Sequence, residues 1–289
     1  MSGTNALEEP ILSWYDENAR DLPWRRPGTS PWAVMVSEFM LQQTPVSRVL
    51  PVYEAWMSSW PTPADLAAVP SGEAVRAWGR LGYPRRALRL HACAVAITTE
   101  HGGEVPDTYE ELRSLPGVGD YTAAAIASFA FGRAHAVLDT NVRRVLGRAV
   151  GGVEFPAPSV TRSERELATA LVPEVHPELW AVAVMELGAL VCTAANPRCA
   201  QCPVQEMCQW RRLGKPPYDG PPRKGQTYAG TDRQCRGRLL AVLRDSEGPV
   251  AASRLEAAWS DVSQRERALA SLLDDGLVVQ EGQRFSLPG

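Results

Sequence analysis

The chain has 289 residues, of which 45% are hydrophobic and 22% charged, and its formal net charge is −3 at pH 7. This length allows two domains with a sizeable core, and the composition is that of a soluble globular protein. No apolar run approaches the length of a membrane span, and residues 1–10 lack the pattern of a secretory signal, so we expect a cytoplasmic protein without membrane contact.

The arginines gather in local clusters, although the net charge alone does not indicate a nucleic-acid partner. Three basic stretches lie within residues 76–89, 143–148 and 211–224. Each stretch predicts either a local basic surface or, more simply, a solvated helix face. The lysines are Lys215 and Lys224, so residues 1–214 contain none.

The first two thirds of the chain are predicted to form many short helices. Ser30 and Pro31 provide a helix start, a cap followed by proline at the first position. Breaks that contain proline and glycine separate the helical segments, and nothing between them alternates as a strand does. Residues 1–212 are therefore predicted to be all-α. The expected helices are 11–20, 32–43, 46–59, 73–80, 85–99, 110–114, 121–131, 142–150 and 180–191.

A carboxylate lies among apolar residues in the predicted helix 32–43. Glu38 is flanked by Phe39 and Leu41, and it shares a helix face with Gln42. Loss of hydration raises the pKa of such a carboxyl group, which makes Glu38 a candidate general acid. A partly exposed glutamate on an amphipathic helix is the alternative.

Residues 115–122, Leu-Pro-Gly-Val-Gly-Asp-Tyr-Thr, predict a tight turn that opens a helix. Gly117 and Gly119 remove side chains where the backbone bends or approaches another molecule. The N-terminus of the following helix suits a phosphate, because it presents unpaired N–H groups and a positive dipole end. Asp139 precedes an arginine-bearing helix, where it can cap that helix or face whatever the turn binds. A simple helical hairpin with a capped second helix is the alternative.

Four cysteines follow in the spacing C-x6-C-x2-C-x5-C. They are Cys192, Cys199, Cys202 and Cys208. In a cytosolic protein this density indicates a metal site rather than disulfides. Zinc and a [4Fe–4S] cluster are both held by four thiolates, and the spacing alone leaves both open. The expected role of this site is structural, to fold the loop and present it to a partner.

Residues 213–230 are rich in proline and glycine and are predicted to be a linker. Residues 231–289 then change character, with three helical segments followed by a β-hairpin, which predicts a winged-helix-like unit. The helices are expected at 236–245, 253–259 and 264–275, and the strands at 276–279 and 284–287.

These segments together resemble the helix-hairpin-helix DNA glycosylase superfamily, and within it the MutY-type adenine DNA glycosylases. The resemblance runs from Trp14 to about Trp210. It also favours a [4Fe–4S] cluster over zinc, because the cysteine spacing matches the iron–sulfur loop of that family. The matching motifs are Leu22-Pro23-Trp24-Arg25, Val36 to Thr44, Leu81-Gly82-Tyr83, Leu115 to Thr122, Leu138 to Val145, and Met185-Glu186-Leu187-Gly188.

The resemblance implies an all-α, two-lobed helix-hairpin-helix glycosylase fold with a [4Fe–4S] loop, followed by the winged-helix-like unit. It further implies a monomeric, nucleoid-associated enzyme that acts on double-stranded DNA. The expected domains are a cluster lobe at 1–25 and 136–212, a helical lobe with the helix-hairpin-helix at 26–135, the linker at 213–230 and the C-terminal domain at 231–289.

The activity implied is base excision repair, in which adenine mispaired with 8-oxoguanine or guanine is released by hydrolysis. Glu38 would protonate adenine at N7, and Asp139 would stabilise the positive charge that develops on the sugar. Tyr121 would assist near the sugar or Asp139, and Asn141 would position Asp139 and water. The base must first leave the duplex stack.

The resemblance also implies DNA contacts that position the duplex. Gln42 and Tyr83 would fill or open the duplex around the mispair. Backbone N–H groups of the glycine turn would hold a phosphate together with a monovalent cation. The expected DNA-binding residues are Gln42, Gln43, Thr44, Tyr83, Gly117, Val118, Gly119 and Arg143.

Related endonuclease III-type enzymes carry a lysine at the position of Tyr121, which forms a Schiff base and leads to strand cleavage. Because residues 1–214 contain no lysine, we expect a monofunctional glycosylase that leaves an abasic site. The chain departs from the family at Pro84, where a second tyrosine is common, and at Ala181-Val182, where Asn-Gln is common. Its C-terminal part is also too short for the larger domain with which many members recognise 8-oxoguanine.

Two other functions fit part of the pattern. A mismatch thymine glycosylase shares most of the motifs, but thymine has no N7 to protonate, so Glu38 favours adenine. A non-catalytic iron–sulfur DNA-binding protein would use the winged helix to read DNA. The presence of both Glu38 and Asp139 argues against that interpretation.

Overall fold

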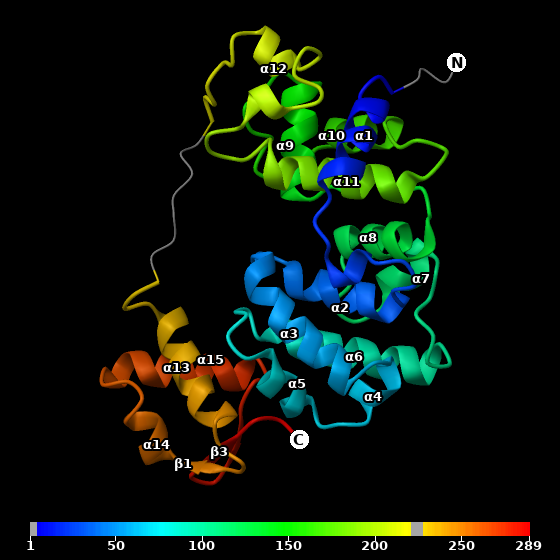
Figure 1. Cartoon of the computed structure of the whole chain (residues 1–289). Coiled ribbons are helices and arrows are strands. Elements are labelled where there is room, and N and C mark those ends of the chain that lie inside the picture. Colours follow the sequence, from blue (N-terminus) through cyan, green and yellow to red (C-terminus); the bar gives the residue numbers. More distant parts are fainter. Residues whose placement is uncertain (1–4, 221–227) are drawn as a thin grey trace. The chain divides into compact units, whose positions relative to one another are not determined.

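The computed structural model describes residues 5–220 and 228–289, and the chain divides into two compact units. Of the described residues, the first unit comprises 5–34, 107–113 and 118–220, and the second comprises 35–106, 114–117 and 228–289. Figure 1 follows the elements along the chain. The central part of the predicted linker, residues 221–227, lies outside the described residues. The lobe boundaries at 25/26 and 135/136 stay a prediction.

The first unit is built around α11 (Pro177–Leu190), which begins with a proline at its first position. Apolar side chains such as Trp180, Val184 and Leu187 are buried, and α1 and α9 pack against this helix. Gly188 permits a close approach of α9, since a Cβ atom there would lie 2.7 Å from the Cβ atom of Asn141. The other helices that fall mainly in this unit are α1 (Glu8–Asn18), α7 (Tyr109–Ser114), α8 (Asp120–Phe131), α9 (Thr140–Ala149), α10 (Arg162–Ala170) and α12 (Gln209–Arg212).

The second unit is built around α6 (Arg85–Glu100), against which α4 (Pro63–Ala67) and α5 (Ser71–Trp78) pack. The inner side of α6 is apolar, and Leu90 and Ile97 are completely buried. Two further helices fall mainly in this unit, α2 (Pro31–Leu41) and α3 (Val46–Ser59).

The C-terminal part of the second unit contains three helices and a small antiparallel sheet with the strand order β1-β3-β2. Phe285 in the central strand pairs with Val250 on one side and with Gln280 on the other. The end of the chain packs on the start of α5, where the amide of Gly72 donates to the carbonyl of Pro288 at 2.9 Å. The elements are α13 (Asp232–Arg244), β1 (Val250–Ala251), α14 (Ala252–Glu256), α15 (Val262–Asp274), β2 (Val279–Glu281) and β3 (Arg284–Ser286).

The predicted fold class is confirmed. Within the described residues up to 212 the regular elements are helical, and the C-terminal part contains the expected three helices and hairpin. Helices α4, α10 and α12 and strand β1 were not predicted, because they are short and lack a long apolar pattern. Helices α4 and α10 start from capping boxes, at Thr62 and Thr161. No helix of the described part is long and apolar enough to cross a lipid bilayer.

Candidate active site

Asp139 lies at the N-terminus of α9, where its carboxylate caps the helix as the sequence predicts. Oδ1 accepts from the amide of Val142 at 2.6 Å, and Oδ2 accepts from Asn141 Nδ2 at 2.8 Å. Burial raises the pKa of Asp139 above that of an ordinary carboxyl group, although these hydrogen bonds and the nearby Arg144 charge work against the increase. The carboxylate is therefore buried and held in one orientation.

Arg144 connects this carboxylate to the cysteine loop. Its Nη2 donates to Asn141 Oδ1 at 2.8 Å and to the Gly188 carbonyl at 2.6 Å. Its Nε donates to the Cys192 carbonyl at 2.6 Å. A continuous set of hydrogen bonds thus runs from Asp139 through Asn141 and Arg144 to the first cysteine. This role of Arg144 could not be predicted from a local pattern, because two of the acceptors are main-chain atoms more than forty residues away.

Tyr121 lies in the first turn of α8, and it packs against a small apolar cluster that includes Val137 and Ala181. Gly119 is the N-cap residue of α8 and supplies no side-chain cap, and nothing lies within 4 Å of the position of a Cβ atom there. The side chain of Val118 is buried, and its carbonyl accepts from Arg113 at 2.9 Å. At the start of α8, the hydrogen bond from Arg113 therefore holds Val118 in place, and the space beside Gly119 contains no neighbouring atoms.

Gly117 belongs to the second unit and has a φ of +80°, in the left-handed region that favours glycine. A Cβ atom at this position would lie 2.7 Å from the Cβ atom of Arg89. Both reasons for glycine that the sequence suggested, a bend and a close approach, are therefore found at Gly117. The close approach is to the protein itself.

Glu38 is buried in α2, with 5% of its surface exposed, between completely buried neighbours such as Met35 and Met40. This environment agrees with the desolvation that the sequence predicts. Most of α2, including Glu38, belongs to the second unit, whereas Asp139 belongs to the first.

Two turns of the second unit carry the residues predicted to enter the duplex. Gln43 and Tyr83 have φ values of +55° and +49°, which are uncommon for residues other than glycine. Tyr83 is 47% exposed, and Gln43 is exposed as well. Backbone held in such a conformation requires strong support from its surroundings, and it is often found at functional sites.

Arg86 supplies that support, because its buried guanidinium bonds to both turns. Nη1 donates to the carbonyls of Phe39, Met40 and Gln42 at 2.8, 3.1 and 2.6 Å. Nη2 donates to the Gly82 carbonyl at 3.1 Å and to Thr44 Oγ1 at 3.0 Å. Burial lowers the pKa of Arg86 to about 10. This value still lies well above neutral pH, so the guanidinium stays charged.

Thr44, a predicted DNA contact, lies behind this turn. It is 6% exposed, and its hydroxyl accepts from Arg86 inside the unit. Thr44 therefore supports the turn, while its contact with DNA stays a prediction.

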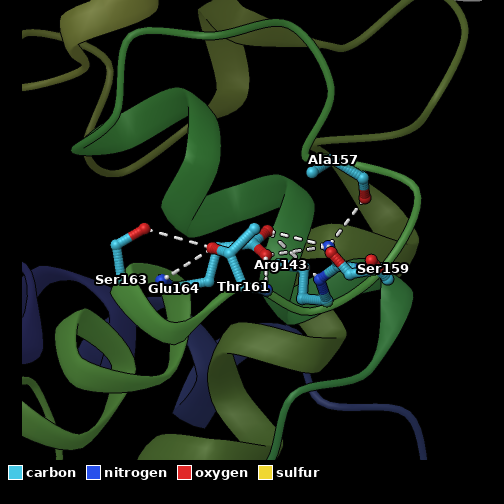
Figure 2. Close-up of polar contacts among 6 residues, drawn as sticks. All are labelled: Arg143, Ala157, Ser159, Thr161, Ser163 and Glu164. Atoms are coloured by element: carbon cyan, nitrogen blue, oxygen red, sulfur yellow. Dashed lines mark hydrogen bonds and ion pairs between the residues drawn. The ribbon is translucent and has the colours of Figure 1, made fainter.

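Arg143, another predicted DNA contact, takes part in an ordered network at the start of α10 (Figure 2). Nη2 donates to the carbonyls of Ala157 and Ser159 at 2.7 and 3.0 Å and forms an ion pair with Glu164 at 2.9 Å. Glu164 also closes a capping box with Thr161. The observed contacts hold the 157–161 loop onto α9, and a phosphate contact of Arg143 stays a prediction.

The four predicted metal ligands share the lining of one cavity, although their side chains are not gathered as ligands around a metal ion. Cys192, Cys199, Cys202 and Cys208 are free cysteines and line one cavity of about 30 Å³. Burial raises the pKa of the Cys202 thiol to about 11.

Arg148 lies beside this cavity, with Nη1 3.4 Å from Cys192 Sγ and 2.8 Å from the Thr193 carbonyl. Burial also raises the pKa of Cys192, while the Arg148 charge and hydrogen bond work to lower it. Within the described residues, no three Cys, His, Asp or Glu side chains form a group arranged to hold a metal ion.

Glu186 is a buried acid for which the sequence suggested no role, although its motif was recognised. Its two oxygens accept from Arg20 Nε at 2.6 Å, from Arg20 Nη2 at 2.7 Å and from Arg25 Nη1 at 2.9 Å. This ion pair fixes the segment after α1 to α11. An acid in the middle of an apolar stretch of helix, away from its first turn, is the signal that could have indicated such a buried pair.

The fold and these residues define a class of protein. Residues 36–170 match the family model described as HhH-GPD superfamily base excision DNA repair protein. The structure of a thermostable thymine-DNA glycosylase is similar, with a TM-score of 0.66 and 28% identity, covering 72% of this chain and 95% of that chain. The class is that of the helix-hairpin-helix DNA glycosylases.

Two mycobacterial relatives narrow the class. The adenine DNA glycosylase of Mycobacterium tuberculosis (strain ATCC 25618 / H37Rv) is 55% identical over 284 residues, which cover 96% of this chain and 92% of the relative. The adenine DNA glycosylase of Mycolicibacterium smegmatis is 54% identical over 281 residues, which cover 96% and 95%. The chain belongs to the adenine DNA glycosylase family, as the resemblance predicts.

Proposed function

We propose that the chain releases adenine mispaired with 8-oxoguanine or guanine from double-stranded DNA and leaves an abasic site. The observation that carries this proposal is the Asp139 carboxylate, which is buried, capped into α9 and bonded to Asn141. A carboxylate held in this way is suited to face a cationic sugar, because its charge is fixed before the reaction begins.

In the proposed reaction the bond between C1′ of the sugar and N9 of adenine breaks, and its electron pair leaves with the base. Glu38 donates a proton to N7, which makes adenine a better leaving group. Asp139 stabilises the positive charge left on the sugar, and water then adds to C1′ and loses a proton. The burial of Glu38 supports its role as the acid.

The proposed enzyme has no lysine within residues 1–214 with which to cut the strand. Tyr121 occupies the position at which related enzymes carry the Schiff-base lysine, and residues 1–214 contain no lysine at all. Hydrolysis of the glycosidic bond is therefore the expected end of the reaction.

We further propose that Cys192, Cys199, Cys202 and Cys208 hold a [4Fe–4S] cluster. The donor set supports this, because all four thiols line one cavity and thiolates are the ligands of such clusters. When bound, the cluster fixes the fold of the loop. The loop in turn contacts Arg144, which orients Asn141 beside Asp139.

The open N-terminus of α8 supports the proposed phosphate site at Gly117, Val118 and Gly119. Gly119 leaves the first amide groups of the helix without a side-chain cap. A DNA phosphate, accompanied by a monovalent cation at the hairpin, would satisfy them.

The decisive assay compares duplexes with A:8-oxoguanine, A:G and T:G pairs under single-turnover conditions, analysed with and without alkali. We expect adenine release from the first two and strand breaks after alkali only.

Asp139→Asn should lower base release by about 10³-fold or more while duplex binding remains, because only the charge is lost. Faster release of thymine, or nicking that borohydride traps without alkali, would refute the proposal.

A further inference from the structure

A groove of about 1080 Å³ lies in the second unit, between the turns held by Arg86 and helix α13 of the C-terminal part. Nine arginines line this groove, and Asp275 is the one acid among its lining residues in the described part of the chain. Gln42 and Tyr83 belong to the same lining. The α13 wall has no place in the proposed base-release reaction.

Several of these arginines are bonded to the protein. Arg48 donates to the Arg80 carbonyl, and Arg244 donates to the Gly79 carbonyl. Asp275 is shared, since it forms ion pairs with Arg236 at 2.6 Å and with Arg85 at 3.2 Å. The negative charge of Asp275 is therefore already neutralised by two arginines of the groove, Arg236 and Arg85.

Three other arginines of the groove are exposed to solvent. Arg80 lies just before the turn that contains Tyr83, Arg89 lies on α6 and Arg238 lies on α13. None of the ion pairs within residues 5–220 and 228–289 includes these three side chains. The two walls of the groove thus present uncompensated positive charge toward the same space.

Like charges this close repel one another. Burial is the main cause that lowers the pKa of Arg244; the charge of Asp245 works against this, and the like charge of Arg80 adds to it. A polyanion relieves such crowding, and a DNA strand carries one negative charge about every 3.4 Å. Arginine is also the side chain best shaped for bidentate bonds to a phosphate.

We infer that α13 and the 79–89 segment together bind the phosphodiester backbone of duplex DNA beside the base pair that Gln42 and Tyr83 contact. The winged-helix-like part is then a DNA-binding element of the enzyme, and α13 is one wall of its site. This inference rests on the proposed function, because it takes the Gln42 and Tyr83 turns as the part that meets the mispair.

The test replaces one exposed arginine on each wall, as Arg80→Gln combined with Arg238→Gln. Affinity for an A:8-oxoguanine duplex should fall about tenfold near 0.1 M salt, and the slope of log K against log salt should decrease by about 1 to 2. Arg80→Glu with Arg238→Glu should weaken binding further. Arg254→Gln, an exposed arginine on α14 outside the groove lining, is the matched control and should bind as the wild type does.

Thermal melting of each variant checks that the fold is retained. Surface substitutions of this kind usually change the free energy of unfolding little. Single-turnover base release by the Arg254→Gln control should stay at the wild-type rate. The inference is overturned if the double glutamine variant has the affinity and salt slope of the Arg254→Gln control. Wild-type protein that binds the duplex yet releases no adenine would refute the proposed function instead.

Discussion

At the scale of single residues, the protonation of Asp139 is decided by opposing effects. Burial raises its pKa, whereas the hydrogen bonds from Val142 and Asn141 lower it. The proposed mechanism needs the ionised form, so base release should be lost when the pH falls below the pKa of Asp139. Because that pKa is raised, the loss should begin above the range of an exposed aspartate.

Asn141→Leu tests this balance, because it removes a donor that favours the ionised carboxylate. The acid limb of the rate profile should move to higher pH by about one unit. The rate at neutral pH should also fall by about tenfold or more, since Asp139 loses its orientation. Single-turnover rates between pH 4 and 8 measure both effects. Asn18→Leu, at the exposed end of α1, is the control, and an acid limb shared by both variants would contradict the assignment.

Residues with partners nearby in sequence could be predicted, whereas those with remote partners could not. Asp139 was identified because a helix cap acts over three residues, and Glu38 because its neighbours are apolar. Arg86 bonds to carbonyls more than forty residues earlier, and Glu186 bonds to Arg20 at a separation of 166 residues. No local pattern contains such partners, so the sequence predicted the capped carboxylate and the role of Asn141 beside it but missed the long-range contacts of Arg86, Arg144 and Glu186.

At the scale of elements, the approach of α9 to α11 depends on one glycine. A Cβ atom at Gly188 would lie 2.7 Å from the Cβ atom and 3.0 Å from the carbonyl oxygen of Asn141, both parts of α9. Gly188→Ala should therefore push the helices apart and displace Asn141 from Asp139. We expect a loss of about 1–3 kcal/mol in the free energy of unfolding, together with slower base release.

The control for this substitution is Gly248→Ala, because nothing lies within 4 Å of the position of its added Cβ atom. Denaturant unfolding and single-turnover rates of the two variants make the comparison. If Gly188→Ala unfolds and reacts as Gly248→Ala does, the close packing of α9 on α11 does not position the carboxylate.

The helices were predicted unequally, for a physical reason. Helix α3 was predicted with its observed bounds, Val46–Ser59, because its buried residues Val49, Tyr53 and Trp56 recur at helical spacing. Helix α10 has one buried residue, Ala168, and its start depends on a capping box. Apolar periodicity is strong in a helix that buries a continuous face and weak in a helix held by caps and ion pairs.

At the scale of the whole molecule, the Glu186 ion pair fixes distant segments of the first unit. Burial acts to raise the pKa of Glu186, but the bonds and charges of Arg20 and Arg25 outweigh it, so the pKa lies below its usual value. The pair therefore stabilises the fold above the usual glutamate pKa. This contribution is lost as the pH falls through the lower value of the folded protein.

Glu186→Gln should lower the free energy of unfolding by about 1–3 kcal/mol at pH 7, because the partly buried guanidinium groups of Arg20 and Arg25 lose their counter-charge. The difference from the wild type should shrink as the pH falls below about 4. Thermal melting at several pH values measures it. Glu174→Gln, an exposed acid of the same unit, should change little, and a deficit that stays constant from pH 7 to pH 3 would contradict this role.

The separation of 166 residues between Arg20 and Glu186 has a consequence for synthesis on the ribosome. Translation adds about 5–20 residues per second, so α1 waits roughly ten to thirty seconds before its partner helix exists. During that interval Ile11, which is completely buried in the finished protein, is open to chaperones and proteases. Helix α1 therefore lacks its packing partner until α11 has been synthesised, and slow codons ahead of α11 would lengthen the time for which its apolar side chains are exposed.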